Sequence, residues 1–176
     1  GAGHVAAALQ PILASIDCKI TIIDDRLELA HSGRFPKGLL LHEDGIQYAT
    51  KHVGGANTYY LVVTHDHQRD QDLVEQLLPK TFAWLGLIGS RSKIAKFFMR
   101  YRAAGIDESL FSKVSAPVGL DIGAITPGEI AIAIAAEIVR VRRKHLDAPQ
   151  SLSAVPIPAR GGDGIARPPG LQQDID

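Results

Sequence analysis

The hydrophobic residues of the chain follow two alternating patterns, one typical of helices and one typical of buried strands. Small and apolar residues recur at helical spacing over 4–15, and an apolar, β-branched run predicts a strand over 18–23. Two further strands, over 59–63 and 84–88, are each followed by a polar loop and a helical pattern. This alternation predicts an α/β fold, a Rossmann-like parallel sheet flanked by helices in three layers.

The later helices carry clear signals at their ends. Gly105 is placed to end the helix that follows the 84–88 strand, and Asp107 is placed to cap a short helical turn. The sequence TPGE at 126–129 combines an N-cap threonine, a proline at the first helical position and a glutamate three residues on. It therefore predicts a capping box, and the isoleucine stripe that follows is expected to pack in the core.

Residues 27–58 have the weakest pattern. Within them Leu39–Leu41, together with Ile46 and Tyr48, is expected to form short strands around Asp44-Gly45. Because several prolines and glycines follow position 147, the sequence predicts a Rossmann-type domain over 1–146 and a Pro/Gly-rich tail over 147–176.

The chain begins on Gly1-Ala2-Gly3, which reads as a strand-to-helix turn with no strand in front of it. Such a turn ordinarily follows a buried strand. We therefore expect a fragment of a longer polypeptide. We also expect either a gap in the sheet beside the 18–23 strand or a filling segment from outside these residues.

Composition narrows the class of protein. The formal net charge is zero over 176 residues and no long basic run occurs, so nucleic acid is not an expected partner. Cys18 is the only cysteine, which favours a reducing compartment, and its place in a predicted strand suggests a core residue. Since no apolar run reaches the roughly 20 residues that a membrane span needs, we expect a cytoplasmic protein without membrane contact.

The first candidate for chemistry is the glycine turn itself. Gly1-x-Gly3, with His4 opening the helix, offers close backbone approach and free N–H donors to a phosphate. Asp24 and Asp25 follow about 20 residues later, where a ribose-binding acid is found in dinucleotide sites. The alternative is a turn that serves packing only.

The second candidate is the loop Thr64-His65-Asp66-His67, which follows a predicted strand. Three interpretations remain open: metal binding without a clear third ligand, helix capping by surface residues, or contact with a polar ligand. We expect no permanently bound metal here.

Two further loops carry polar groups. Ser90 and Arg91 open a helix after a glycine and could hold an anion, unless Ser90 merely caps and Arg91 is solvated. Asp121 lies between two glycines just before the capping box, in either a shaped loop or a simple connector. Because ligands of parallel sheets bind outside the carboxyl ends of the strands, all these loops are expected at one edge.

Together these stretches resemble the C-terminal Rossmann domain of the XdhC family. The resemblance rests on GAGHVA at 1–6, DDR at 24–26, RFP at 34–36, THDH with Asp70, GLIGSRSK at 86–93 and GLDIGAITPGEIA at 119–131. Members of this family are accessory proteins for xanthine dehydrogenase and related molybdenum hydroxylases.

The resemblance implies a non-catalytic maturation factor, a chaperone that binds molybdenum cofactor (molybdopterin). Its partners would be the apo form of xanthine dehydrogenase or a related hydroxylase and a cysteine desulfurase. Whether the protein forms a homo-oligomer is left open by the sequence. An NAD(P)-binding oxidoreductase and a nucleotide-binding regulatory module remain the alternatives. We assign no catalytic residue. The expected cofactor-binding residues are Gly1, Gly3, His4, Asp24, Thr64, His65, Asp66, His67, Ser90, Arg91 and Asp121.

Overall fold

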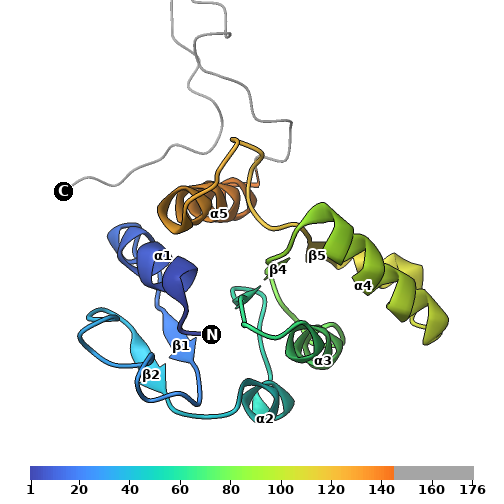
Figure 1. Ribbon diagram of the computed structural model, residues 1–176, viewed down its shortest axis with the longest axis horizontal. Helices are drawn as coiled ribbons and strands as arrows, with labels where there is room; N and C mark the ends of the chain where they lie inside the picture. The colour runs from blue at the N-terminus through green and yellow to red at the C-terminus, as the bar shows by residue number, and fades with distance from the viewer. Residues whose placement is uncertain (145–176) are drawn as a thin grey trace, which may run out of the picture.

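The computed structural model describes residues 1–144, so the predicted tail lies outside the described residues. Helices and strands alternate along most of the chain (Figure 1). In order they are α1 (His4–Ser15), β1 (Thr21–Ile23), β2 (Leu39–Leu41), α2 (Gly45–Lys51), β3 (Tyr59–Val62), α3 (His67–Leu77), β4 (Trp84–Leu87), α4 (Arg91–Ala103), the 3-10 helix η1 (Glu108–Lys113), β5 (Val114–Ser115) and α5 (Pro127–Arg142).

All strand pairs are parallel, as predicted, but they form two sheets. β1 pairs with β2 with Thr21 opposite Leu39, and β4 lies between β3 and β5 with Leu85 opposite both Tyr60 and Val114. Helices cover both sides, with α1 and α5 packed together on one side and α3 and α4 on the other (Figure 1). The three-layer Rossmann-like arrangement is therefore confirmed.

Strand β3 shows how the sequence fixes these layers. Tyr59 and Leu61 pack against the core cluster of α1 and α5, whereas Tyr60 and Val62 belong to the cluster of α3 and α4. Successive side chains of a strand point to opposite faces, and both faces are covered here. An uninterrupted apolar run is the pattern that such a strand requires.

A slot separates the two sheets where the missing strand was expected. β1 and β3 both line a cavity of about 670 Å³, together with apolar side chains such as Leu9, Trp84 and Ile138. Gly1 also lines it, and the N-terminus lies between the two sheets in Figure 1. The expected gap beside β1 is confirmed.

Cys18 lies at this slot. It is half-buried just before β1, and the Arg142 guanidinium is 3.8 Å from its sulfur. The expectation of a core cysteine was therefore wrong. The observed strand begins only at Thr21, so Cys18 occupies the turn region that leads into β1.

The end signals of the later helices are confirmed. Thr126 and Glu129 form the reciprocal capping box of α5, and Asp107 caps η1 through the Ser109 N–H. Gly105 follows α4 with φ of +74°, a conformation that favours glycine. These short-range signals are reliable because each is complete within one helical turn.

The interpretation of residues 46 and 48 as strand residues was wrong. Ile46 and Tyr48 lie in helix α2, which begins after Asp44. The Asp44 carboxylate accepts hydrogen bonds from the N–H groups of Ile46 and Gln47, so an N-cap outweighs the β-branched and aromatic composition. The strand predicted at Leu39–Leu41 is confirmed as β2.

Within residues 1–144, no helix is both long enough and apolar enough to cross a membrane.

Candidate functional site

The glycine turn before α1 contains two glycines with different surroundings. A Cβ on Gly1 would lie 2.6 Å from the carbonyl oxygen of Val63, so Gly1 is required by its packing against the end of β3. A Cβ on Gly3 would meet no atom within 4 Å. Gly3 has φ of −72°, which any residue adopts, so neither packing nor backbone conformation requires glycine at this position.

The N-terminus of α1 differs from those of the other described helices. Its N-cap, Gly3, provides no side-chain hydrogen bond, whereas a side chain caps each of the other helices. The first N–H groups of a helix have no partner inside it. The α1 terminus therefore keeps donors for an acceptor that the described residues do not supply.

Asp24 holds the glycine turn in place. Its Oδ2 accepts the Ala2 N–H at 2.7 Å and the Arg26 guanidinium at 2.7 Å, and its Oδ1 accepts the Arg26 N–H and Nε. Burial alone would raise the pKa of Asp24, but the hydrogen bonds from Arg26 and Ala2 hold this pKa well below its usual range. Both carboxylate oxygens of Asp24 therefore already accept hydrogen bonds from groups of the protein itself.

The loop after β3 is organised by Asp70, which is buried. The hydroxyl and the N–H of Thr64 both donate to Oδ1 of Asp70, at 2.6 and 3.2 Å. His67 Nδ1 lies 3.8 Å from Asp70 Oδ2, with 63% of the His67 side chain exposed. The polar part of this loop is therefore anchored while His65 and His67 stay accessible.

Asp66 takes the capping role in this loop. Its carboxylate accepts the N–H groups of Gln68 and Arg69 at 2.7 and 3.2 Å, and these hydrogen bonds lower the pKa of Asp66. The alternative of helix capping is thus correct for Asp66. Capping does not involve the two exposed histidines, and His67 contacts only Asp70 among the described ion pairs.

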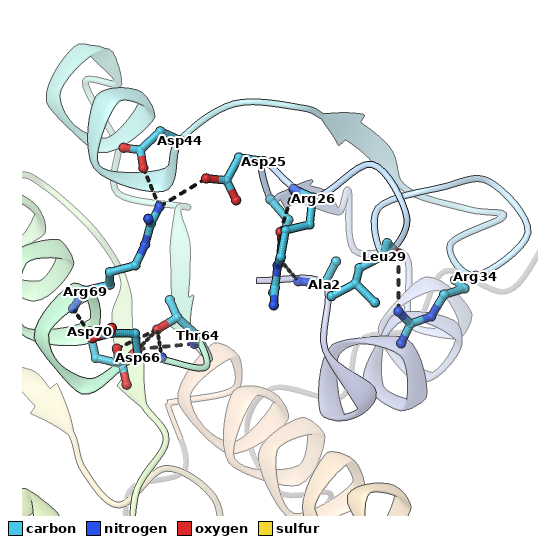
Figure 2. A network of polar contacts seen from close by, with 11 residues as sticks. Ala2, Asp25, Arg26, Leu29, Arg34, Asp44, Thr64, Asp66, Arg69 and Asp70 are labelled. Atoms are coloured by element: carbon cyan, nitrogen blue, oxygen red, sulfur yellow. Dashed lines mark hydrogen bonds and ion pairs between the residues drawn. The ribbon is translucent and has the colours of Figure 1, made fainter.

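Arg69 connects the two sheets at this edge. Its guanidinium lies 3.5 Å from Asp25, which follows β1, and forms an ion pair with Asp44, the N-cap of α2. Figure 2 shows Arg69 between these two carboxylates, next to the group of Thr64, Asp66 and Asp70. This link brings the loop after β1 close to the loop after β3.

The loop after β4 meets the loop before α5. Ser90 accepts the Lys93 N–H at 3.4 Å and caps α4, and Arg91 pairs with Asp121 at 3.1 Å. Both charged side chains are more than four-fifths exposed. Their contact is therefore a solvent-screened pair that a ligand can open at little cost.

The glycine turn contacts both the end of β3, through Gly1, and Asp24, through Ala2. The loop before α5 contacts α4 through the Arg91–Asp121 pair. Since β3 and β4 are parallel neighbours, Thr64 and Gly89 follow them at the same edge. The expectation that these loops share the carboxyl edge of the sheets is confirmed.

Sequence reasoning missed Glu137, a buried acid in the middle of α5. Its carboxylate accepts the Trp84 indole N–H at 3.2 Å and the Gly119 N–H at 2.5 Å. Glu137 thus fixes the start of the loop that carries Asp121. Only its position on a strongly apolar helix face could have indicated this role.

We expect Glu137→Ala to lower the free energy of unfolding by about 2–4 kcal/mol, because it leaves the buried Trp84 indole N–H and the half-buried Gly119 N–H without an acceptor. Urea denaturation would measure this loss. Glu129→Ala, which removes an exposed capping acid from the same helix, is expected to cost about 1 kcal/mol or less. Equal losses in the two variants would contradict the role of Glu137.

Among residues 1–144 no group of three or more His, Cys, Asp or Glu side chains is placed to hold a metal ion. The roles of His4, His65 and His67 in ligand binding remain predictions.

The chain is similar to a known protein family and to two named bacterial proteins. The model of the XdhC Rossmann domain matches residues 1–138. The YqeB protein of Escherichia coli K12 is 34% identical over 143 residues, which cover 81% of this chain and 26% of that protein. A Bacillus subtilis protein, named as a probable subunit of xanthine dehydrogenase, is 28% identical over 145 residues, covering 82% of this chain and 42% of its own length.

A solved structure shares the fold. The crystal structure of a xanthine dehydrogenase from Bacillus halodurans superposes with a TM-score of 0.72, at 23% identity, over 89% of this chain and 43% of that one. The present chain spans well under half the length of each of these three proteins.

Proposed function

Because this chain belongs to the XdhC family, we propose that it is a cofactor-binding domain that serves the maturation of a xanthine dehydrogenase or a related molybdenum hydroxylase. The ligand we propose is molybdenum cofactor, a pterin that carries a phosphate group. When bound, it would supply the metal centre that the client enzyme uses. The chain itself would bind, orient and shield it.

The observation that carries this proposal is the open space at Gly3 beside the uncapped N-terminus of α1. Glycine at this position is unexplained by packing, but it allows a phosphate to approach the free N–H groups closely. The helix dipole favours a negative charge at the same place. The residues present therefore fit the phosphate end of the proposed ligand.

The remaining groups suit the polar ring. The Thr64 loop and the Arg91–Asp121 pair lie along the same edge as the glycine turn. Exposed His65, His67 and His4 supply further hydrogen-bonding groups there. A pterin presents both donors and acceptors, so a mixed set of this kind is chemically suited to it.

A dinucleotide is a weaker candidate on these contacts. The acid after β1 would have to accept ribose hydroxyls. Both oxygens of Asp24 already accept hydrogen bonds from Ala2 and Arg26, and Asp25 lies 3.5 Å from the Arg69 guanidinium.

Cofactor transfer also needs partners. We propose the apo form of the hydroxylase and a cysteine desulfurase, with the open edge of the site facing them.

The proposal is tested with Gly3→Ala. The added methyl group fills space that the protein leaves open, so the melting temperature is expected to stay within about 2 °C of the parent, whereas affinity for molybdenum cofactor is expected to fall roughly ten- to a hundredfold. Affinity would be measured by fluorescence titration of purified protein with the cofactor, and separately with NADH.

Gly55→Ala is the matched control. Gly55 precedes β3 at the opposite edge, and a Cβ there would make only an ordinary contact with Thr58. Unchanged cofactor affinity in Gly3→Ala would overturn the proposed role of the glycine turn. Tight NADH binding without cofactor binding would favour the nucleotide-binding alternative.

A further inference from the structure

A second, smaller cavity lies between α3 and α4, beside the carboxyl end of β4. Its volume is about 100 Å³, space for a small chemical group rather than for one water molecule. Leu87, Ile94 and Phe97, all buried, form its apolar lining. His67 and Asp70 border it from the first turn of α3.

Three cationic side chains of α4 also line this cavity. Lys93, Lys96 and Arg100 follow one another at helical spacing, so they lie on the helix face turned toward α3. None of the three forms an ion pair with another described residue. Other arginines of α3 and α4 behave differently, since Arg69, Arg91 and Arg102 each contact a carboxylate.

The charge of the cavity wall is therefore positive. Among the described residues that line it, Asp70 is the only carboxylate, and Oδ1 of Asp70 already accepts two hydrogen bonds from Thr64. The cavity also adjoins the first turns of both α3 and α4, where helix dipoles add positive potential. An apolar floor under a cationic rim suits a ligand that has both an apolar body and an anionic head.

We infer that this cavity binds a phosphate ester whose organic part packs on Ile94 and Phe97 while Lys93, Lys96 and Arg100 hold the phosphate. Arg100 offers the planar fork that pairs well with phosphate oxygens, and the two lysines add point charges. Of the residues proposed to bind the cofactor, only His67 borders this cavity, and the inference does not use it. The inference therefore does not depend on the cofactor proposal.

Phenyl phosphate is a suitable probe, with inorganic phosphate and phenol as its two halves. Titration followed by the backbone amide NMR signals of residues 93–97 is expected to show saturable binding of phenyl phosphate. Inorganic phosphate should bind more weakly because it cannot use the apolar floor, and phenol more weakly still. Raised salt should weaken the binding of both phosphates.

The variants Lys96→Gln and Arg100→Gln are each expected to weaken phenyl phosphate binding about three- to tenfold, and the double variant by more. Lys113→Gln is the matched control, because it removes one positive charge from an exposed side chain of η1 that does not line the cavity. All three substitutions are on the surface, and their melting temperatures should match the parent.

Either of two results would overturn the inference. The first is equal weakening by Lys96→Gln and Lys113→Gln, which would indicate a general charge effect. The second is equal affinity for inorganic phosphate and phenyl phosphate, which would exclude a role for the apolar floor.

Discussion

A four-residue apolar strand added in front of Gly1, as long as β3, is expected to raise the melting temperature by about 5–15 °C. The strand would enter the slot between β1 and β3, run parallel to both and end at the glycine turn. Differential scanning calorimetry of the extended and parent chains would measure the difference.

The expected gain in stability is the difference between the free energy gained by burying side chains and the entropy lost by ordering the added strand. Each buried apolar side chain contributes about 1.5–3 kcal/mol, and ordering each residue costs about 1–2 kcal/mol. Hydrogen bonds to the free edges of β1 and β3 add to the gain, so a net gain of about 2–4 kcal/mol is expected. The extension also replaces the Gly1 ammonium, whose pKa is lowered by burial, with a neutral peptide group.

The control is an extension of equal length built from serine and glycine. It cannot fill an apolar cavity and should leave the melting temperature within about 2 °C of the parent. A second control places proline in the centre of the apolar strand, where it removes one ladder hydrogen bond and clashes with a neighbouring strand. If all three extensions had the same effect, the slot would not be a strand site.

The layered α/β fold could be predicted because its signals are local or periodic. Tyr59–Val62 and Trp84–Leu87 are continuous apolar runs, and the capping box at Thr126 is complete within four residues. Strand β5 was not predicted, because Val114–Ser115 is too short to have a period and is defined only by its pairing with β4.

The candidate site was only partly predictable, and the reason lies in contacts between distant residues. The sequence pointed to Asp24 and Arg91 as ligand-binding groups. In the structure Asp24 holds Ala2 and Arg26, and Arg91 faces Asp121, thirty positions along the chain. The cavity beside the cationic face of α4 could not be predicted either, because it depends on where α3 packs. The sequence shows which polar side chains are present. It does not show which of them already form hydrogen bonds or ion pairs with other residues of the protein.

The role of Asp24 leads to a prediction about acid stability. Asp24→Asn is expected to lower the free energy of unfolding at pH 7 by about 2–4 kcal/mol, because the amide leaves the Arg26 guanidinium without its carboxylate partner. The loss should become smaller in acid. Since the hydrogen bonds to Arg26 and Ala2 lower the pKa of folded Asp24, its contribution is complete above the unfolded pKa of about 4 and declines as the pH falls below that value.

Urea denaturation at intervals from pH 7 to pH 3 would measure both effects. The parent and the Asp24→Asn variant should differ most at neutral pH and approach each other below about pH 4. Asp25→Asn is the control, because the side chain of Asp25 is 49% exposed and lies 3.5 Å from Arg69, so its loss should cost at most about 1 kcal/mol. A difference between parent and Asp24→Asn that stays constant over this range would show that the carboxylate of Asp24 does not stabilise the glycine turn through its charge.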